Sequence, residues 1–207
     1  MHKAPVTKLN RMTNRALPQM LVNVAGRLMD SATFFAMAAV RPSKSMIFMF
    51  HGIESAKDSY QYDNSTPLHS RSVFECFVAW LRQAARIVPL EDILCEPQSD
   101  DGVARAALTF DDGLLNHYTA VYPLLRELDA RATFFVPSGL IGTPGQMTRA
   151  MIRELSAGGM SIGSHTVTHP ALPALSLREA HAELYESKAA LEDLTGKPCA
   201  DLAYPYG

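Results

Sequence analysis

Residues 106–113, Ala-Ala-Leu-Thr-Phe-Asp-Asp-Gly, join a mostly apolar run to two adjacent carboxylates and a glycine. A short apolar run that ends in turn residues predicts a buried strand followed by a turn. Neighbouring side chains of a regular strand point to opposite faces, so Asp111 and Asp112 can converge on one site only where the strand ends. Gly113 allows the chain to turn there. Because α/β folds place their sites at the carboxyl ends of parallel strands, this stretch predicts both a strand and a site.

The chain on both sides of this stretch alternates short apolar runs with helical stretches. This alternation predicts βα units around a largely parallel sheet or barrel. The predicted strands are Met46–Phe50, Arg86–Pro89, Arg105–Phe110, Ala132–Pro137, Met160–Ser164 and Asp201–Tyr204. The predicted helices are Ser72–Ala85, a helix that opens at Pro123 after a turn from Leu114, Met147–Ala157 and Leu177–Leu194. Ser176 and Glu179 have the spacing of a capping box before the last helix, which Gly196 and Pro198 end.

Composition is that of one ordinary globular domain, because 47% of the 207 residues are hydrophobic and 19% are charged. The net charge is −2 and no long basic block occurs, so no nucleic-acid partner and no polybasic membrane patch are expected. The three cysteines, Cys76, Cys95 and Cys199, are too widely separated for a zinc ribbon or a disulfide scaffold. No oligomeric state is predicted.

The first 44 residues form an N-terminal extension that we expect to be helical. Basic residues precede an apolar stretch over residues 17–40, which is compatible with a signal peptide, and Ala36-Met37-Ala38 resembles a cleavage site. Arg27 and Asp30 interrupt the stretch, however, and its apolar residues recur at helical spacing on one face. We therefore expect an amphipathic helix without stable membrane insertion. A cytoplasmic location is favoured slightly over a periplasmic or secreted one, and export stays open.

A second polar cluster, Ser164-His165-Thr166-Val167-Thr168-His169-Pro170, follows another predicted strand. Two imidazoles four residues apart can bind one ion if the segment coils through a single turn. Pro170 disfavours helical geometry at His169, so we expect a turn and not the helix of a metalloprotease motif. Each cluster has an ordinary structural alternative: the histidines as a hydrogen-bonded pair, and the aspartates as exposed acids in a turn like Asp100-Asp101-Gly102.

Together the two clusters predict one site at a shared edge of the sheet. A carboxylate and two histidines suit zinc, cobalt, nickel or iron, with zinc preferred, and leave positions open for water and substrate. A cation there lowers the pKa of bound water toward neutrality, and the second carboxylate can accept the proton. The sequence therefore predicts metal-assisted hydrolysis.

These residues resemble a known family. Residues 109–113 and 164–169 are similar to the first two motifs of the polysaccharide deacetylases, the NodB-homology or carbohydrate esterase 4 group, and residues 49–53 resemble a segment that begins many bacterial members. The resemblance runs from about Ser45 to Gly207 and implies an α/β fold, a distorted (β/α)7-type barrel. We expect a domain over 45–207 that lacks its C-terminal part, so the barrel is incomplete, with about six parallel strands and the N-terminal helical extension.

The resemblance implies removal of N-acetyl or O-acetyl groups from a glycan, with release of acetate. By motif position Asp112, His165 and His169 would bind the metal, and Asp111 would be the general base. A backbone N–H near Tyr206, in the third motif with Pro205, would help to stabilise the oxyanion. His51 is a further candidate neighbour of the site, whereas His117 is as compatible with a helix surface as with the site.

The third motif departs from the family pattern, since Ala203 stands where the commonest form has an arginine that orients the base. Arginine-free versions resemble deacetylases of the exopolysaccharide poly-N-acetylglucosamine type. The expected general-acid histidine of the later motifs has no counterpart before Gly207, so a second hypothesis is a truncated, catalytically incompetent fragment that binds metal or a partner. A third, phosphoryl transfer with magnesium, ranks lowest because adjacent aspartates and paired histidines are atypical of magnesium sites.

Overall fold

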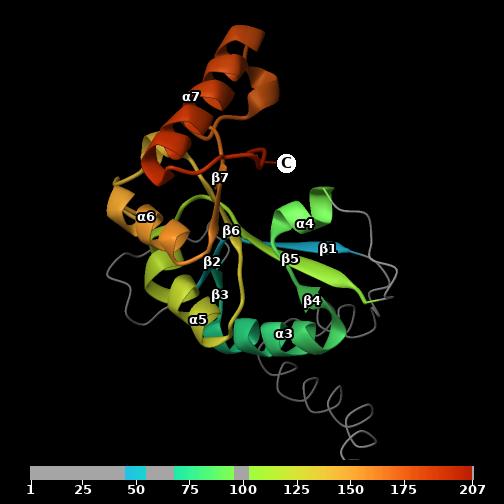
Figure 1. Cartoon of the computed structure of the whole chain (residues 1–207). Coiled ribbons are helices and arrows are strands. Elements are labelled where there is room, and N and C mark those ends of the chain that lie inside the picture. The colour runs from blue at the N-terminus through green and yellow to red at the C-terminus, as the bar shows by residue number, and fades with distance from the viewer. Residues whose placement is uncertain (1–44, 55–67, 96–102, 207) are drawn as a thin grey trace, which may run out of the picture.

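The computed structural model of the chain describes residues 45–54, 68–95 and 103–206 (Figure 1). The predicted N-terminal extension over 1–44 and the turn at Asp100-Asp101-Gly102 lie outside the described residues. Within the described residues, no helix has both the length and the apolar composition needed to cross a bilayer.

The centre of the fold is β5 (Arg105–Phe110), whose six residues are all buried. Parallel pairing joins it to β1 (Met46–Phe50) and to β6 (Thr133–Val136), and β6 pairs in turn with β7 (Ser161–Ser164). The short strand β4 (Arg86–Ile87) pairs with the beginning of β5. The order β1-β5-β6-β7 confirms the predicted α/β fold with parallel strands, and the described strands form an open sheet that does not close into a barrel.

The two faces of β5 contribute to different cores, as the alternation of side chains in a strand requires. Ala106, Leu108 and Phe110 belong to the larger core, which also contains buried residues of α3 (Arg71–Ala84), α5 (Tyr122–Glu127) and α6 (Arg149–Ala157). Ala107 packs on the opposite face with Leu90 of α4 (Leu90–Cys95), a short helix that was not predicted. Strand β5 is thus buried on both faces, which explains the mostly apolar run before the aspartates.

Two of the predicted strands need correction, and one small sheet was not predicted. A strand over Asp201–Tyr204 is wrong, because only Leu202 forms an isolated bridge to Ser164; Pro205 cannot donate to a ladder and Tyr206 turns the chain at φ 65°. The strand predicted over Arg86–Pro89 ends at Ile87, and α4 begins at Leu90. A second sheet of two residues per strand, β2 (Gly52–Ile53) with β3 (Leu68–His69), was also missed.

The helix predicted to open at Pro123 begins earlier. A π-helical turn, His117–Val121, precedes α5, and the Tyr122 N–H bonds to the carbonyl of His117. Pro123 is therefore near the start of α5 but not of the helical segment. The wider turn in front of it accommodates a residue that has no N–H to donate.

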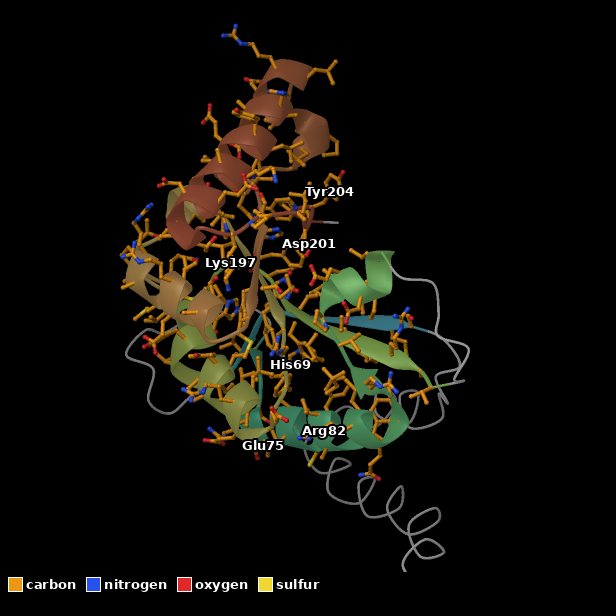
Figure 2. The ribbon with its side chains drawn as sticks, in the orientation of Figure 1. His69, Glu75, Arg82, Lys197, Asp201 and Tyr204 are labelled. Carbon is orange, nitrogen blue, oxygen red and sulfur yellow. The ribbon has the colours of Figure 1, made fainter. Side chains whose placement is uncertain are left out.

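Helix α7 (Leu177–Thr195) follows β7 and extends away from the sheet, as Figure 1 shows. Its capping box is confirmed, since Ser176 accepts from the Glu179 N–H and the Glu179 side chain accepts from the Ser176 N–H. Gly196 ends the helix in the left-handed conformation at φ 66°. The chain then returns beside α7 through Asp201 and Tyr204, which Figure 2 labels near the end of β7.

Candidate metal centre

The aspartate pair lies where β5 ends. Asp111 still continues the ladder, because its N–H donates to the carbonyl of Phe50 at 2.9 Å. Asp112 and Gly113 then turn the chain, with φ of 77° and 64°. A Cβ on Gly113 would lie 3.1 Å from a Val136 methyl carbon, so this position needs glycine for space as well as for conformation.

The two histidines lie in the loop that follows β7. His165 continues the ladder by donating its N–H to the carbonyl of Val136 at 3.1 Å. Thr166 and His169 both have left-handed backbone conformations, with φ of 67° and 60°, and the His169 N–H donates to the Thr166 hydroxyl at 3.1 Å. The predicted turn thus forms in place of a helix, and it directs both imidazoles toward the same point.

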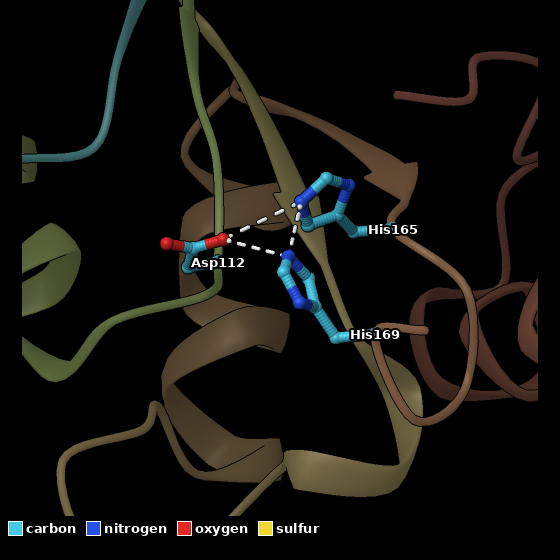
Figure 3. Close-up of side chains that lie close together, drawn as sticks. All are labelled: Asp112, His165 and His169. Atoms are coloured by element: carbon cyan, nitrogen blue, oxygen red, sulfur yellow. Dashed lines mark hydrogen bonds and ion pairs between the residues drawn. The ribbon is translucent and has the colours of Figure 1, made fainter. Parts of the chain in front are cut away.

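Asp112, His165 and His169 converge on one point (Figure 3). Asp112 Oδ1 lies 3.4 Å from Nε2 of His165 and 3.3 Å from Nε2 of His169. The two Nε2 atoms are 3.1 Å apart. The three groups come from the ends of β5 and β7, which are not neighbours in the sheet but are separated by β6.

This donor set fits a divalent transition metal. Two ligands bound at about 2.0–2.1 Å in tetrahedral geometry are about 3.3 Å apart, and the three distances here lie close to that value. One carboxylate oxygen with two imidazole nitrogens is a combination that zinc and its neighbours in the transition series prefer. Three protein ligands leave one tetrahedral position open, as catalytic sites require.

His165 is oriented by a backbone group. Its Nδ1 lies 2.9 Å from the carbonyl oxygen of Ala203, which can only accept, so Nδ1 carries the proton and Nε2 presents its lone pair to the site. Ala203, whose side chain cannot replace the expected arginine, therefore contributes through its main chain. The same segment is tied to β7 because the Ala203 N–H donates to the Ser164 carbonyl at 3.0 Å.

Burial and the neighbouring charges shift the pKa values of all three groups. Burial alone would raise the pKa of Asp112, but the hydrogen bond with His165 and the charges of the nearby imidazoles outweigh it, so that pKa is lowered. Burial acts to lower the pKa of His165, but Asp112 and the Ala203 carbonyl raise it overall. Burial and the charge of His165 lower the pKa of His169. These shifts favour the ionised form of Asp112 and the neutral form of His169.

Asp111 differs from its neighbour in environment. Burial raises the pKa of its carboxyl group, although the charges of His165 and His51 oppose the rise. Its Oδ1 atom is buried and has no hydrogen-bond partner among the described residues. This carboxylate has a raised pKa and one oxygen without a hydrogen bond, and it lies next in sequence to a possible metal ligand. Such a group is suited to accept a proton.

The other predicted site residues lie nearby. His51 places Nε2 4.0 Å from Oδ2 of Asp112, the carboxylate oxygen that does not face the two histidines. The ring of Tyr206 packs edge-on against His169 with centroids 4.9 Å apart, and 78% of Tyr206 is exposed. Pro205 is buried beside it. Tyr204, also on this segment, is 62% exposed (Figure 2).

His117, which the sequence suggested for either the helix surface or the site, lies in the core. It is fully buried, and its ring packs against both Phe110 and Phe134, which stack on each other. Its Nε2–H donates to the carbonyl of His51, so it supports the backbone of a site residue without facing the site. A histidine four residues after a glycine turn gives no periodic signal of burial, and only the packed structure identifies this role.

Comparison with known proteins shows which family this chain is similar to. A family model described as "Polysaccharide deacetylase" matches residues 98–207. The Bacillus subtilis protein YxkH, named as a polysaccharide deacetylase, is 29% identical over 170 residues, which are 81% of this chain and 58% of that protein. The peptidoglycan-N-acetylglucosamine deacetylase PgdA of Listeria monocytogenes is 37% identical over 105 residues, 50% of this chain and 22% of PgdA.

A solved structure of another protein described as a polysaccharide deacetylase has a similar fold. The crystal structure of a polysaccharide deacetylase from Bacillus cereus superposes with a TM-score of 0.64 at 26% identity, and the match covers 78% of this chain and 51% of that one. The chain thus spans between about a fifth and three fifths of the length of these three proteins.

Proposed function

This chain belongs to the polysaccharide deacetylase family, and we propose that it removes acetyl groups from a glycan with the help of a divalent metal ion. The observation that carries the metal requirement is the convergence of Asp112, His165 and His169 at distances of 3.1–3.4 Å between donor atoms. The name of PgdA supports an N-acetylglucosamine-containing glycan as the substrate class. N-acetyl groups are accordingly the first substrates to test, with O-acetyl groups second.

The proposed roles follow from where each group lies. Asp112, His165 and His169 would hold the ion, for which zinc is the first candidate ahead of cobalt, nickel and iron. A bound ion of this kind supplies Lewis acidity, which polarises a carbonyl oxygen and lowers the pKa of water. Asp111, with its raised pKa and free oxygen, would accept the proton from the attacking water.

The third motif would complete the site beside the two histidines. Tyr206 adopts φ 65° directly beside His169, and its backbone N–H would donate to the developing oxyanion. His51 and Pro205 would be neighbours of the substrate and not ligands. With Ala203 in place of an arginine, we propose an exopolysaccharide such as poly-N-acetylglucosamine as the preferred glycan. We propose 45–207 as part of the deacetylase domain and 1–44 as a separate extension.

Acetate release tests the proposal. The purified chain is incubated with chito-oligosaccharides, poly-N-acetylglucosamine or peptidoglycan, with added zinc, cobalt or nickel or with chelator. The Asp112→Asn variant should lose metal-dependent release, and Asp111→Asn should retain zinc binding but lose turnover. Asp193→Asn, an exposed acid on α7, is the matched control and should behave as the wild type. Acetate release by Asp111→Asn at the wild-type rate would refute the base assignment, and zinc binding without turnover in the wild type would favour a purely binding role.

A further inference from the structure

Glu183, on the side of α7 that faces the histidine loop, makes hydrogen bonds that no motif predicts. Its Oε2 accepts from the backbone N–H groups of Val167 at 2.7 Å and Thr168 at 2.9 Å. Its Oε1 accepts from the hydroxyl of Thr168 at 2.7 Å. A single carboxylate thus binds two of the three residues between His165 and His169.

The loop needs such support because its backbone is strained. Thr166 is β-branched yet has φ 67°, and His169 has φ 60°. Conformations of this kind persist only where the surroundings determine them. On the far side of the loop, the carbonyls of Thr166 and Val167 accept from the N–H groups of Ser138 and Gly139 at 3.0 and 2.9 Å. The loop is therefore held between the 138–139 turn and Glu183.

Other side chains of helix α7 bind the strand and the segment beside the histidine loop. Ser187, one turn after Glu183, is fully buried and accepts a hydrogen bond from the Ser164 hydroxyl at 2.8 Å. Lys188 and Glu192 bind the backbone of Cys199 at 2.7 and 3.0 Å, at the start of the segment that carries Ala203. The same helix therefore connects the histidine loop, the end of β7 and the segment that orients His165.

We propose that Glu183 is a positioning residue of the metal centre, which holds the 165–169 loop so that both imidazoles meet Asp112. This inference rests on the proposed function, because it assigns Glu183 a role in metal affinity. Hydrogen bonds to charged acceptors are stronger than neutral ones, so the carboxylate is suited to restrain a strained loop. Glutamine can still accept two N–H bonds and donate to the Thr168 hydroxyl, so it should restore much of the effect.

The test combines zinc titration by calorimetry with amide hydrogen exchange on the full chain. Glu183→Ala should bind zinc about 10–100-fold more weakly, the range typical of groups that orient metal ligands. The Val167 and Thr168 amides should lose protection while β7 keeps it. Glu183→Gln should lie between Glu183→Ala and the wild type. Glu186→Ala, at an exposed position on the same helix, is the matched control and should change neither quantity.

Each outcome decides the proposal. Wild-type zinc affinity in folded Glu183→Ala would overturn it, whether or not the amides lose protection. Should that variant fail to fold, Glu183→Asp, whose carboxylate is one methylene too short to reach the loop, takes its place with the same criterion. If the wild-type chain binds neither zinc nor cobalt nor nickel, the proposed function fails separately. In that case, two features show whether Glu183 orders the loop. One is amide exchange at Val167 and Thr168, and the other is whether the variant keeps the contact between the rings of His165 and His169, whose centroids are 4.7 Å apart.

Discussion

Lowering the pH below 6.5 should destabilise this protein through one buried histidine. His117 is fully buried against the rings of Phe110 and Phe134, and burial lowers its pKa from 6.5 to about 4. The unfolded chain takes up a proton on this residue near pH 6.5, whereas the folded protein does so only near pH 4. Because the unfolded state binds more protons across this window, the free energy of unfolding falls as the pH falls through it.

The magnitude follows from the size of the pKa difference. A shift from 6.5 to about 4 corresponds to about 3 kcal/mol of stability, present above pH 6.5 and lost by pH 4. The slope cannot exceed about 1.4 kcal/mol per pH unit for a single proton. Against a total stability of about 5–15 kcal/mol for a domain, this loss is readily measured.

Urea unfolding followed by circular dichroism, in chelator at several pH values between 7.5 and 4.5, measures the effect. His117→Gln, whose amide can still donate to the His51 carbonyl, should lose the slope that this histidine contributes, although it is less stable at pH 7.5. His181→Gln, on the exposed surface of α7, is the matched control and should keep the wild-type slope. Equal slopes in the wild type and His117→Gln, or an NMR titration of the His117 ring above pH 6, would refute the reasoning.

Two further predictions concern the core and a thiol. Phe110→Ala should cost about 3–5 kcal/mol in urea unfolding, since the ring is fully buried and stacks on Phe50 and Phe134 with centroids 5.4 and 5.3 Å away; a loss below about 1 kcal/mol would contradict this packing. Burial raises the pKa of the Cys199 thiol to about 11, so iodoacetamide at pH 8 should label Cys199 much more slowly than half-buried Cys76, as peptide mass spectrometry can measure. Labelling of both at the same rate would refute the burial.

Local chemistry was enough to predict the strands and helix ends whose information lies in consecutive residues. The apolar run before Asp111 predicted β5 with its correct bounds, and Ser176, Glu179 and Gly196 predicted how α7 begins and ends. These features depend on side-chain alternation, on capping hydrogen bonds and on the conformational freedom of glycine. Each of these acts within a few residues of the chain.

Local chemistry failed where long-range packing decided the conformation. Residues 201–204 have strand composition, but the single bridge from Leu202 to Ser164 ends because Pro205 and Tyr206 redirect the chain. The helical segment before Pro123 contains a π turn, which no spacing of apolar residues predicts. The burial of His117 likewise results from its packing on β5 and β6.

The sequence alone determined which groups could form the site: two acids at the end of a strand and two histidines four residues apart after another. Only the tertiary structure decided that Asp112 meets both imidazoles, because the distance between the ends of β5 and β7 depends on β6 lying between them. It also decided that the Ala203 carbonyl orients His165 and that Glu183 binds the histidine loop. Backbone carbonyls and helix-borne acids have no distinctive local pattern, so their partners are set by where the folded chain brings them.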